Sequence, residues 1–141
     1  MNLGPGDARD LLERYARARE GRDVDAAMEL YRGDADLRDD PFADHATGEL
    51  AVRAWWNRFA AERANVEFDV ERSWASGPTV LASWHGAWTR RETAERIRER
   101  GFATFELDEA GLIVLERHWT LERSVGTDGT FQAEPADGPA A

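Results

Sequence analysis

Apolar positions repeat at helical spacing in the first half of the chain. Residues 7–20 follow this pattern and end at a glycine, which predicts a helix with Asp7 as its N-cap. A second helix is expected between Asp23 and Gly33, with an apolar face of Val24, Ala27, Met28 and Tyr31. A third helix is expected over residues 48–64, with a buried stripe of Ala51, Trp55, Phe59 and Ala60, and with Val52 and Trp56 beside it.

Two adjacent carboxylates, Asp39 and Asp40, stand between the second and third helical patterns. Pro41 forbids a helix at this point and biases the residue before it to extended geometry. Residues 35–38 are therefore expected to form a short strand, and residues 43–47 a loop. This places both carboxylates just after a strand, where a pocket could begin.

The second half of the chain alternates apolar and polar residues. Val66, Phe68 and Val70 are separated by acidic residues, which is typical of a half-buried strand. Further strands are expected over residues 79–90, 97–107 and 112–123, separated by a turn at Ser76-Gly77-Pro78, a polar connection at 91–95 and a hairpin loop at 108–111. Gly101 lies inside a strand pattern, which indicates a bulge or a close approach by another group.

Three helices followed by antiparallel strands predict an α+β fold, with the N-terminal helices packed on a curved, mainly antiparallel sheet. A curved sheet closed by helices makes a cone-shaped α+β barrel that can hold a pocket. The domain is expected to span residues 7–123, after a flexible N-terminus at 1–6. Residues 124–141 are rich in Gly, Asp, Pro and Ala and are predicted to be a disordered tail.

Length and charge narrow the classes of protein. The chain has 141 residues, enough for one domain. Its 18 basic and 28 acidic residues give a net charge of −10, which repels phosphate backbones and argues against nucleic acid. There is no cysteine, which excludes disulfides and thiolate ligands. No signal peptide or membrane-length apolar run is visible, so a cytoplasmic protein without membrane contact is expected.

Three runs carry a resemblance to a known family: "ELYRGDADLRDDPF", "GELAVRAWWNRF" and "FELDEAGLIVLERHW". With the order of elements, they make residues 7–123 resemble the nuclear transport factor 2-like superfamily, and within it most of all the SnoaL-type polyketide cyclases and the ketosteroid isomerases. The resemblance implies the cone-shaped fold with a small-molecule pocket. That fold hosts isomerases, dehydratases, cyclases, epoxide hydrolases and plain binding modules.

The resemblance to the isomerases also implies roles for individual residues. Asp40 matches the proton-shuttling carboxylate, and Tyr15 matches the tyrosine that donates to the oxyanion. Tyr31 and Trp56 fall at positions of supporting tyrosines, of which the second is a departure. Ala103 is the larger departure, because the isomerases place a protonated Asp there to complete the oxyanion hole.

The last predicted strand has two faces of different character. Counted from Gly111, one face carries Val114, Glu116, His118 and Thr120, and the other carries Ile113, Leu115, Arg117, Trp119 and Leu121. The resemblance places the first face in the pocket and the second in a sheet-mediated homodimer. A slip of one residue would instead place Arg117 and Trp119 inside.

We expect chemistry based on proton transfer. Asp40 would shuttle the proton, while Tyr15 and His118 would polarise a substrate oxygen or donate a proton. Glu116 would orient His118 from the same strand face. The expected substrate-binding residues are mostly aromatic and form the pocket wall: Tyr31, Phe42, Trp55, Trp56, Phe59, Trp84, Trp88, Ala103 and Glu116.

Other chemistries lack their sequence signals. The three histidines, His45, His85 and His118, are scattered without metal-ligand spacing. There is no glycine-rich phosphate loop and no nucleophile elbow. A site without metal or cofactor is therefore predicted.

These patterns predict a cofactor-independent isomerase, lyase or cyclase that acts by acid–base catalysis on a small hydrophobic carbonyl compound. One alternative is a non-catalytic ligand-binding or dimerisation module of the same fold. Another is an epoxide hydrolase-like enzyme, which needs a carboxylate pair and an arginine; Arg117 would serve if the last strand slipped. Burial of Asp40 in a closed, largely apolar cavity would favour the acid–base enzyme.

Overall fold

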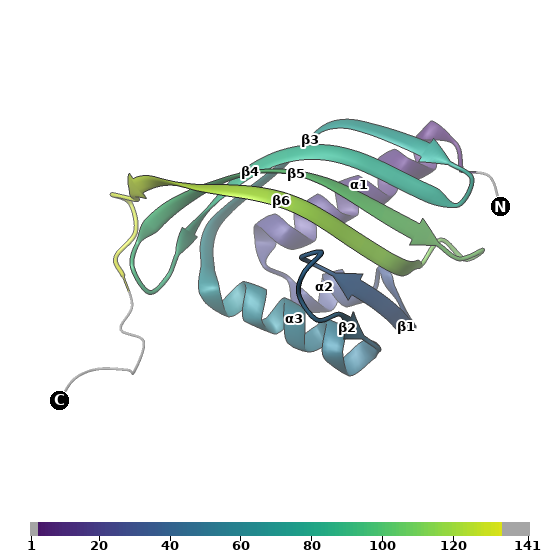
Figure 1. The fold of residues 1–141 in the computed structure, drawn as a ribbon, viewed down its shortest axis with the longest axis horizontal. Helices are drawn as coiled ribbons and strands as arrows, with labels where there is room; N and C mark the ends of the chain where they lie inside the picture. The colour runs from purple at the N-terminus through teal and green to yellow at the C-terminus, as the bar shows by residue number, and fades with distance from the viewer. Residues whose placement is uncertain (1–2, 134–141) are drawn as a thin grey trace.

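One curved sheet of six strands carries the helices on its inner face (Figure 1). The computed structural model describes residues 3–133. Its elements, in chain order, are α1 (Pro5–Gly21), α2 (Val24–Met28), β1 (Tyr31–Arg38), β2 (Ala46–Thr47), α3 (Glu49–Glu62), β3 (Arg63–Ser76), β4 (Thr79–Arg90), β5 (Glu95–Leu107) and β6 (Ile113–Thr127). The predicted α+β class, with three helices on a curved sheet, is confirmed.

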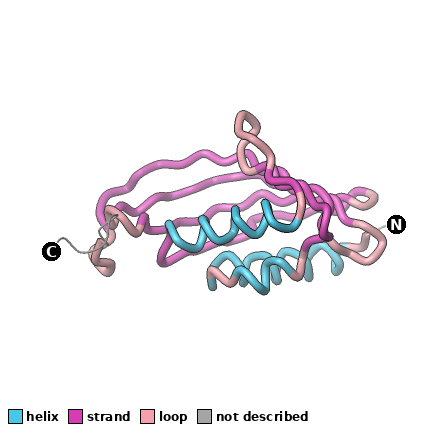
Figure 2. The backbone as a smooth tube through the Cα atoms, turned by 90° about the horizontal axis from the view of Figure 1, so that it is seen from below, coloured by secondary structure: helices cyan, strands magenta, loops and turns pink. Residues whose placement is uncertain are grey.

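The sheet is mixed and does not close on itself. Its strand order is β2-β1-β6-β5-β4-β3, in which β3 to β6 follow one another as antiparallel neighbours. β1 pairs in parallel with β6, and the short β2 pairs antiparallel with β1. Seen from below, the helices lie on one side of the sheet and run in roughly the same direction as its long strands (Figure 2).

The core lies between α1, α3 and the inner face of the sheet. Period-two alternation turns one set of strand side chains inward, where they meet the apolar stripes of the two longer helices. The largest fully buried apolar side chains are Tyr15, Leu37, Val52, Trp56, Val80, Trp84, Phe105 and Ile113. Within residues 3–133, no helix is long and apolar enough to cross a membrane.

The start of α1 differs from the expectation. The N-cap is Gly4, and Pro5 occupies the first turn, where its missing N–H costs nothing. Asp7 lies three residues after the cap and accepts a hydrogen bond from Gly4 N at 3.0 Å. The prediction of Asp7 as the N-cap is therefore wrong. Residues 5 and 6 belong to the helix and not to a flexible terminus.

The expected second helix is shorter than its pattern. Asp23 caps α2 as predicted, accepting from Ala26 N at 3.1 Å. The helix ends at Met28, and Tyr31 begins β1 instead of continuing the helical face. Pairing with the distant β6, including Tyr31 opposite Ile113, overrides the local helical pattern. β1 therefore has eight residues, where a strand over 35–38 was expected.

The buried face of α3 is turned relative to the expected stripe. Val52, Trp56 and Phe59 are its buried residues, whereas Ala51 and Trp55 are only half-buried. Trp56 is held inward because its indole Nε1 donates to the Tyr31 hydroxyl at 3.0 Å. The predicted stripe is therefore right for Phe59 and wrong for Ala51, Trp55 and Ala60, which are half-buried.

The C-terminal part of the sheet extends further than expected. β6 runs to Thr127, so a disordered tail from residue 124 is wrong for residues 124–127. Asp128 accepts from Thr89 and Asn65 side chains, and its N–H donates to Ala94 O at 2.7 Å. These bonds fasten the end of β6 to neighbouring segments. The rest of the predicted tail, residues 134–141, lies outside the described residues.

Gly101 marks a close approach and not a bulge. It pairs in regular register with Trp84 on β4 and with Thr120 on β6. A Cβ at this position would meet the Trp84 indole at 2.6 Å, closer than atoms can pack. The absent side chain therefore lets the Trp84 ring lie flat over β5 on the inner face.

Candidate functional site

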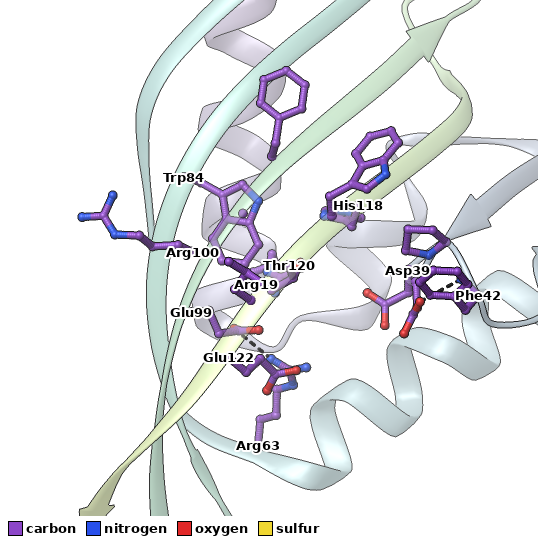
Figure 3. Close-up of a pocket in the computed structure, with 16 residues that line it drawn as sticks. Arg19, Asp39, Phe42, Arg63, Trp84, Glu99, Arg100, His118, Thr120 and Glu122 are labelled. Atoms are coloured by element: carbon purple, nitrogen blue, oxygen red, sulfur yellow. Dashed lines mark hydrogen bonds and ion pairs between the residues drawn. The ribbon is translucent and has the colours of Figure 1, made fainter.

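A cavity of about 650 Å³ opens between the inner face of the sheet, α1 and the loop after β1 (Figure 3). A drug-sized molecule fits this volume. On the inner side, the polar side chains that line it are Arg19, Asp39, Asp40, Arg63, Glu99, His118, Thr120 and Glu122, and the aromatic ones are Phe42 and Trp84. The residues that alternate with these along β5 and β6 border the cavity from the outer face of the sheet: Arg100, Phe102, Trp119 and Leu121.

A buried hydrogen-bond network centred on Glu116 lies behind one wall of this cavity. Tyr31 donates its hydroxyl to Glu116 Oε1 at 2.5 Å, and Tyr15 donates to Oε2 at 2.8 Å. His118 Nε2 lies 2.5 Å from the same Oε2. Glu116 and His118 are 0% and 1% exposed. The predicted inward register of β6 is confirmed, and the alternative with Arg117 and Trp119 inside is wrong.

This network keeps Glu116 ionised. Burial by itself raises the pKa of Glu116, but hydrogen bonds from His118, Tyr31 and Tyr15 outweigh it and lower the pKa below its usual value. Burial, and then the negative charge of Glu116, raise the pKa of both tyrosines. The tyrosines therefore remain neutral donors to a charged acceptor.

The network fixes the tautomer of His118. Because Nε2 faces an ionised carboxylate, we assign the ring proton to Nε2. The other nitrogen, Nδ1, forms no hydrogen bond within residues 3–133, and His118 lines the cavity. With the ring proton on Nε2, Nδ1 is the nitrogen left to accept from a ligand, which is the arrangement of a general base backed by a carboxylate.

The tyrosine expected to donate to a substrate oxygen has a different partner. Tyr15 is fully buried, its hydroxyl proton goes to Glu116, and its oxygen accepts from Arg19 Nη1 at 3.1 Å. Tyr15 therefore positions Glu116 and His118.

A second group of charges lies nearer the cavity mouth. Glu99 on β5 stands directly opposite Glu122 on β6, and Arg63 Nη1 lies 3.3 Å from Glu99 Oε1. Burial, and then the charge of Glu99, raise the pKa of Glu122. Burial, and then the charge of Arg19, lower the pKa of Arg63. The arrangement is a carboxylate pair with an arginine beside it.

Asp40 does not occupy a closed cavity. It is exposed at the cavity rim, and its Oδ1 accepts from Phe42 N at 2.8 Å, which forms an Asx turn. The expectation of a buried Asp40 is wrong, because β1 ends at Arg38 and the chain then turns outward through Pro41. Its proton-shuttling role stays a prediction. Phe42 also lies on the rim and is 98% exposed.

Most of the expected aromatic wall is core. Among the predicted binding residues, Trp84 and Phe42 line the cavity. The others do not line it, because they pack between the helices and the sheet or, like Glu116, lie behind the wall: Tyr31, Trp55, Trp56, Phe59, Trp88, Ala103 and Glu116. His45 and His85 are outside the cavity, where they pair with Asp36 and with Asp69 and Glu71.

Five charged residues that line the cavity were missed: Arg19, Arg63, Glu99, Arg100 and Glu122. Two of them carry a readable signal. Arg19 follows Tyr15 by four residues and so shares its helix face, and Glu122 follows His118 by four and so shares its strand face. Within residues 3–133, no group of three potential ligand side chains could hold a metal ion.

Comparisons with known proteins agree with this geometry. A sequence model of the SnoaL-like domain matches residues 12–116. No curated protein sequence matches the chain. The fold is similar to that of SalBIII, an epoxide hydrolase/cyclase-like enzyme in pyran ring formation of the polyether salinomycin, with a TM-score of 0.76 and 20% identity over 87% of this chain and 97% of that one.

Two further solved structures share the fold. An LEH-like epoxide hydrolase from M. tuberculosis has a TM-score of 0.70 and 21% identity over 82% of this chain and 84% of that one. A putative SnoaL-like polyketide cyclase from Shewanella denitrificans has a TM-score of 0.70 and 17% identity over 84% of this chain and 92% of that one. At these identities the likeness shows the fold.

Proposed function

Because the chain belongs to the SnoaL-like domain family, we propose that its cavity is the active site of a cofactor-independent acid–base isomerase, lyase or cyclase. The substrate would be a hydrophobic carbonyl compound. The observation that carries this proposal is the pairing of His118 Nε2 with the ionised Glu116 at 2.5 Å, on the wall of a cavity that holds a small molecule.

In this mechanism His118 Nδ1 removes a proton from the carbon next to the substrate carbonyl. The electron pair of the broken C–H bond forms the enolate, and the proton makes His118 an imidazolium that Glu116 stabilises. The imidazolium then returns the proton to another carbon, which completes an isomerisation. In a cyclisation, the enolate carbon first attacks a second carbonyl, and the proton goes to the new alkoxide.

Hydrogen exchange at carbon tests this step without a known product. In deuterated water, the protein should replace the α-protons of β-keto and β,γ-unsaturated ketones by deuterium, as measured by proton NMR. The variant His118→Gln should slow exchange by about 100-fold, the usual size of a general-base contribution. His85→Gln, a change at an exposed histidine outside the cavity, is the matched control. Equal exchange rates for His118→Gln and the wild type would exclude this base.

A second candidate function is epoxide hydrolysis, and a separate observation favours it. The carboxylate pair and arginine that this chemistry needs are present as Glu99, Glu122 and Arg63, while the expected Arg117 faces away. Glu99 would accept a proton from water as the water oxygen attacks an epoxide carbon. Glu122, with its raised pKa, would donate a proton to the epoxide oxygen.

The two candidates separate on matched substitutions. Diol formation from styrene oxide should be lost in Glu99→Gln and Glu122→Gln and kept in His118→Gln if the second candidate holds. Ketone exchange should show the opposite pattern if the first one holds. Absence of both activities, with ligand binding retained, would leave a non-catalytic binding module.

We also propose that the protein is a homodimer through the outer face of the sheet. Trp119 and Leu121 of β6 are 42% and 80% exposed there, and Trp74 of β3 is 40% exposed. Exposed aromatic and aliphatic side chains on one face favour an interface over solvent. Sedimentation analysis should give a dimer that Leu121→Glu dissociates, and a wild-type monomer at micromolar concentration would contradict it.

A further inference from the structure

Arg19 is a buried cation without a carboxylate partner. It is 3% exposed, and its Nη1 donates a hydrogen bond to the neutral hydroxyl of Tyr15 at 3.1 Å. Within residues 3–133, no carboxylate oxygen lies within 4.0 Å of its guanidinium group. A guanidinium group has five N–H donors, and a buried one is normally paired with an anion.

Aromatic rings surround Arg19 and fix its position. The guanidinium carbon lies 4.8 Å from the ring centres of Phe59 and Phe68, 5.3 Å from that of Trp84 and 5.8 Å from that of Tyr15. These rings stabilise the charge but accept no ordinary hydrogen bonds from it. Arg19 also lines the cavity, so an anion could reach it only from there (Figure 3).

Unpaired donors gather on the same cavity wall. In the described part of the chain, the buried side-chain polar atoms without a partner are Arg19 Nε, Arg63 Nε, Trp84 Nε1 and Trp88 Nε1. The first three belong to residues that line the cavity. Native proteins rarely leave buried donors unpaired, so this wall is short of acceptors. The unpaired atoms themselves are covered by protein, and a ligand in the cavity would meet the other guanidinium N–H groups of Arg19 and Arg63.

No carboxylate of the site forms a direct ion pair with Arg19, and the negative charges of Glu99 and Glu116 act on it from a distance: burial lowers the pKa of Arg19, but Tyr15 and these two charges raise it overall. Glu99 is paired with Arg63 at 3.3 Å, and Glu116 is engaged by the two tyrosines and His118. Glu122 and Asp39 are exposed, and neither forms an ion pair with Arg19. Arg19 is therefore a buried cation of the cavity wall whose guanidinium group has no direct anionic partner.

We propose that the cavity binds a hydrophobic molecule carrying a carboxylate group, and that Arg19 binds this carboxylate. The inference rests on the proposed function and names its substrate class as a keto acid instead of a neutral ketone. Arg19 and His118 both contact the Tyr15 hydroxyl, at 3.1 and 3.2 Å. A carboxylate at Arg19 would therefore lie beside the base, with the apolar remainder of the ligand along Trp84.

Matched pairs of ligands test this directly. We would measure the dissociation constants of 2-naphthylacetate, 4-phenylbutyrate and cyclohexylacetate, and of the amide of each, by calorimetry. The wild type should bind at least one carboxylate about tenfold or more tighter than its amide. If no pair shows a preference for the carboxylate, the proposal is overturned, whatever the variants do.

Variants of α1 locate the preference. Arg19→Met should abolish it while the affinity for the amide stays within about twofold, and Arg19→Lys should retain part of it, because lysine keeps the charge but loses the forked donors. Arg17→Met removes the same charge from an exposed position of the same helix and should change nothing. If Arg19→Met does not fold, the Arg19→Lys variant provides the test. A carboxylate preference in Arg19→Lys as large as that of the wild type would contradict bidentate binding by Arg19.

Failure of this inference can be told apart from failure of the proposed function. His118→Gln should keep the carboxylate preference and lose deuterium exchange. Exchange of neutral ketones without carboxylate preference would overturn the inference alone. Carboxylate preference without exchange of any keto acid would overturn the proposed base alone.

Discussion

The two polar regions of the inner face differ in how completely their groups are paired. Both carboxylate oxygens of Glu116 have hydrogen-bond partners: Tyr31 at Oε1, and Tyr15 and His118 at Oε2. Around Arg19, buried donors lack acceptors, and the neighbouring groups open to the cavity. We infer from this difference that the side chains around Glu116 keep their positions without a ligand, whereas the donors around Arg19 find their acceptors in a bound ligand.

The largest loss of stability should come from removing the carboxylate of Glu116, which lies at the centre of the buried hydrogen-bond network. Glu116→Ala leaves two tyrosine hydroxyls and the His118 N–H without their acceptor in a buried site. Breaking a buried, charged hydrogen-bond set in this way should lower the free energy of unfolding by about 3–5 kcal/mol. Urea denaturation measures this, with Glu71→Ala, an exposed carboxylate on the outer face, as the control. A decrease in the free energy of unfolding below about 1 kcal/mol would mean that the Glu116 network does not stabilise the site.

A second substitution tests the wall between the two regions. Gly101→Ala would place a methyl group 2.6 Å from the Trp84 indole, so the ring must move. Overpacking of this kind costs about 1–3 kcal/mol, and the displaced ring should also weaken ligand binding. Gly33→Ala, where nothing lies within 4 Å, is the matched control for thermal unfolding. Equal melting temperatures for both variants would contradict the close approach.

The dependence of stability on pH should separate the two regions by sign. The folded-state pKa of Glu116 lies below its ordinary value of 4.5, so its contribution is full above pH 4.5 and is lost as the pH falls through the folded value. The folded-state pKa of Glu122 lies above 4.5, so its contribution is full below pH 4.5 and is lost as the pH rises through the folded value.

Denaturation curves at several pH values check both signs. Relative to the wild type, Glu116→Gln should flatten the decline in stability below pH 4.5. Glu122→Gln should flatten the decline in stability above pH 4.5, with a small effect because Glu122 is an exposed residue whose carboxyl group is only partly shielded from water. Identical pH profiles for the two variants would remove the electrostatic distinction between the regions.

The sequence predicted the parts of the fold that depend on local periodicity. The strand over residues 79–90 matches β4 at both ends, because its alternation is regular and Gly77-Pro78 precedes it. The alternation of the last strand defined its two faces, and the family resemblance selected the face with Glu116 and His118 as the inward one. β1 was cut short because its partner, β6, lies some 80 residues away in the chain, and such pairing leaves no local signal.

The site was harder to predict than the fold. Asp40 has the sequence surroundings of a buried carboxylate, yet the turn after Arg38 directs it outward, and turn direction depends on tertiary contacts. The error for Arg19 is the reverse, because a residue expected at the surface is buried. A charged residue in a helix full of arginines is expected on the surface, and only the aromatic cage around it shows that it is inside. Buried charges are rare enough that sequence reasoning passes over them.

The protonation state of His118 tests the central claim most directly. Long-range proton–nitrogen NMR correlation of the protein labelled with ¹⁵N at histidine, assigned with His118→Gln, distinguishes a protonated ring nitrogen from an acceptor. Near neutral pH we expect the proton on Nε2, facing Glu116, and an unprotonated Nδ1 facing the cavity. A proton on Nδ1 with an unprotonated Nε2 would contradict the account, because no acceptor nitrogen would then face a ligand.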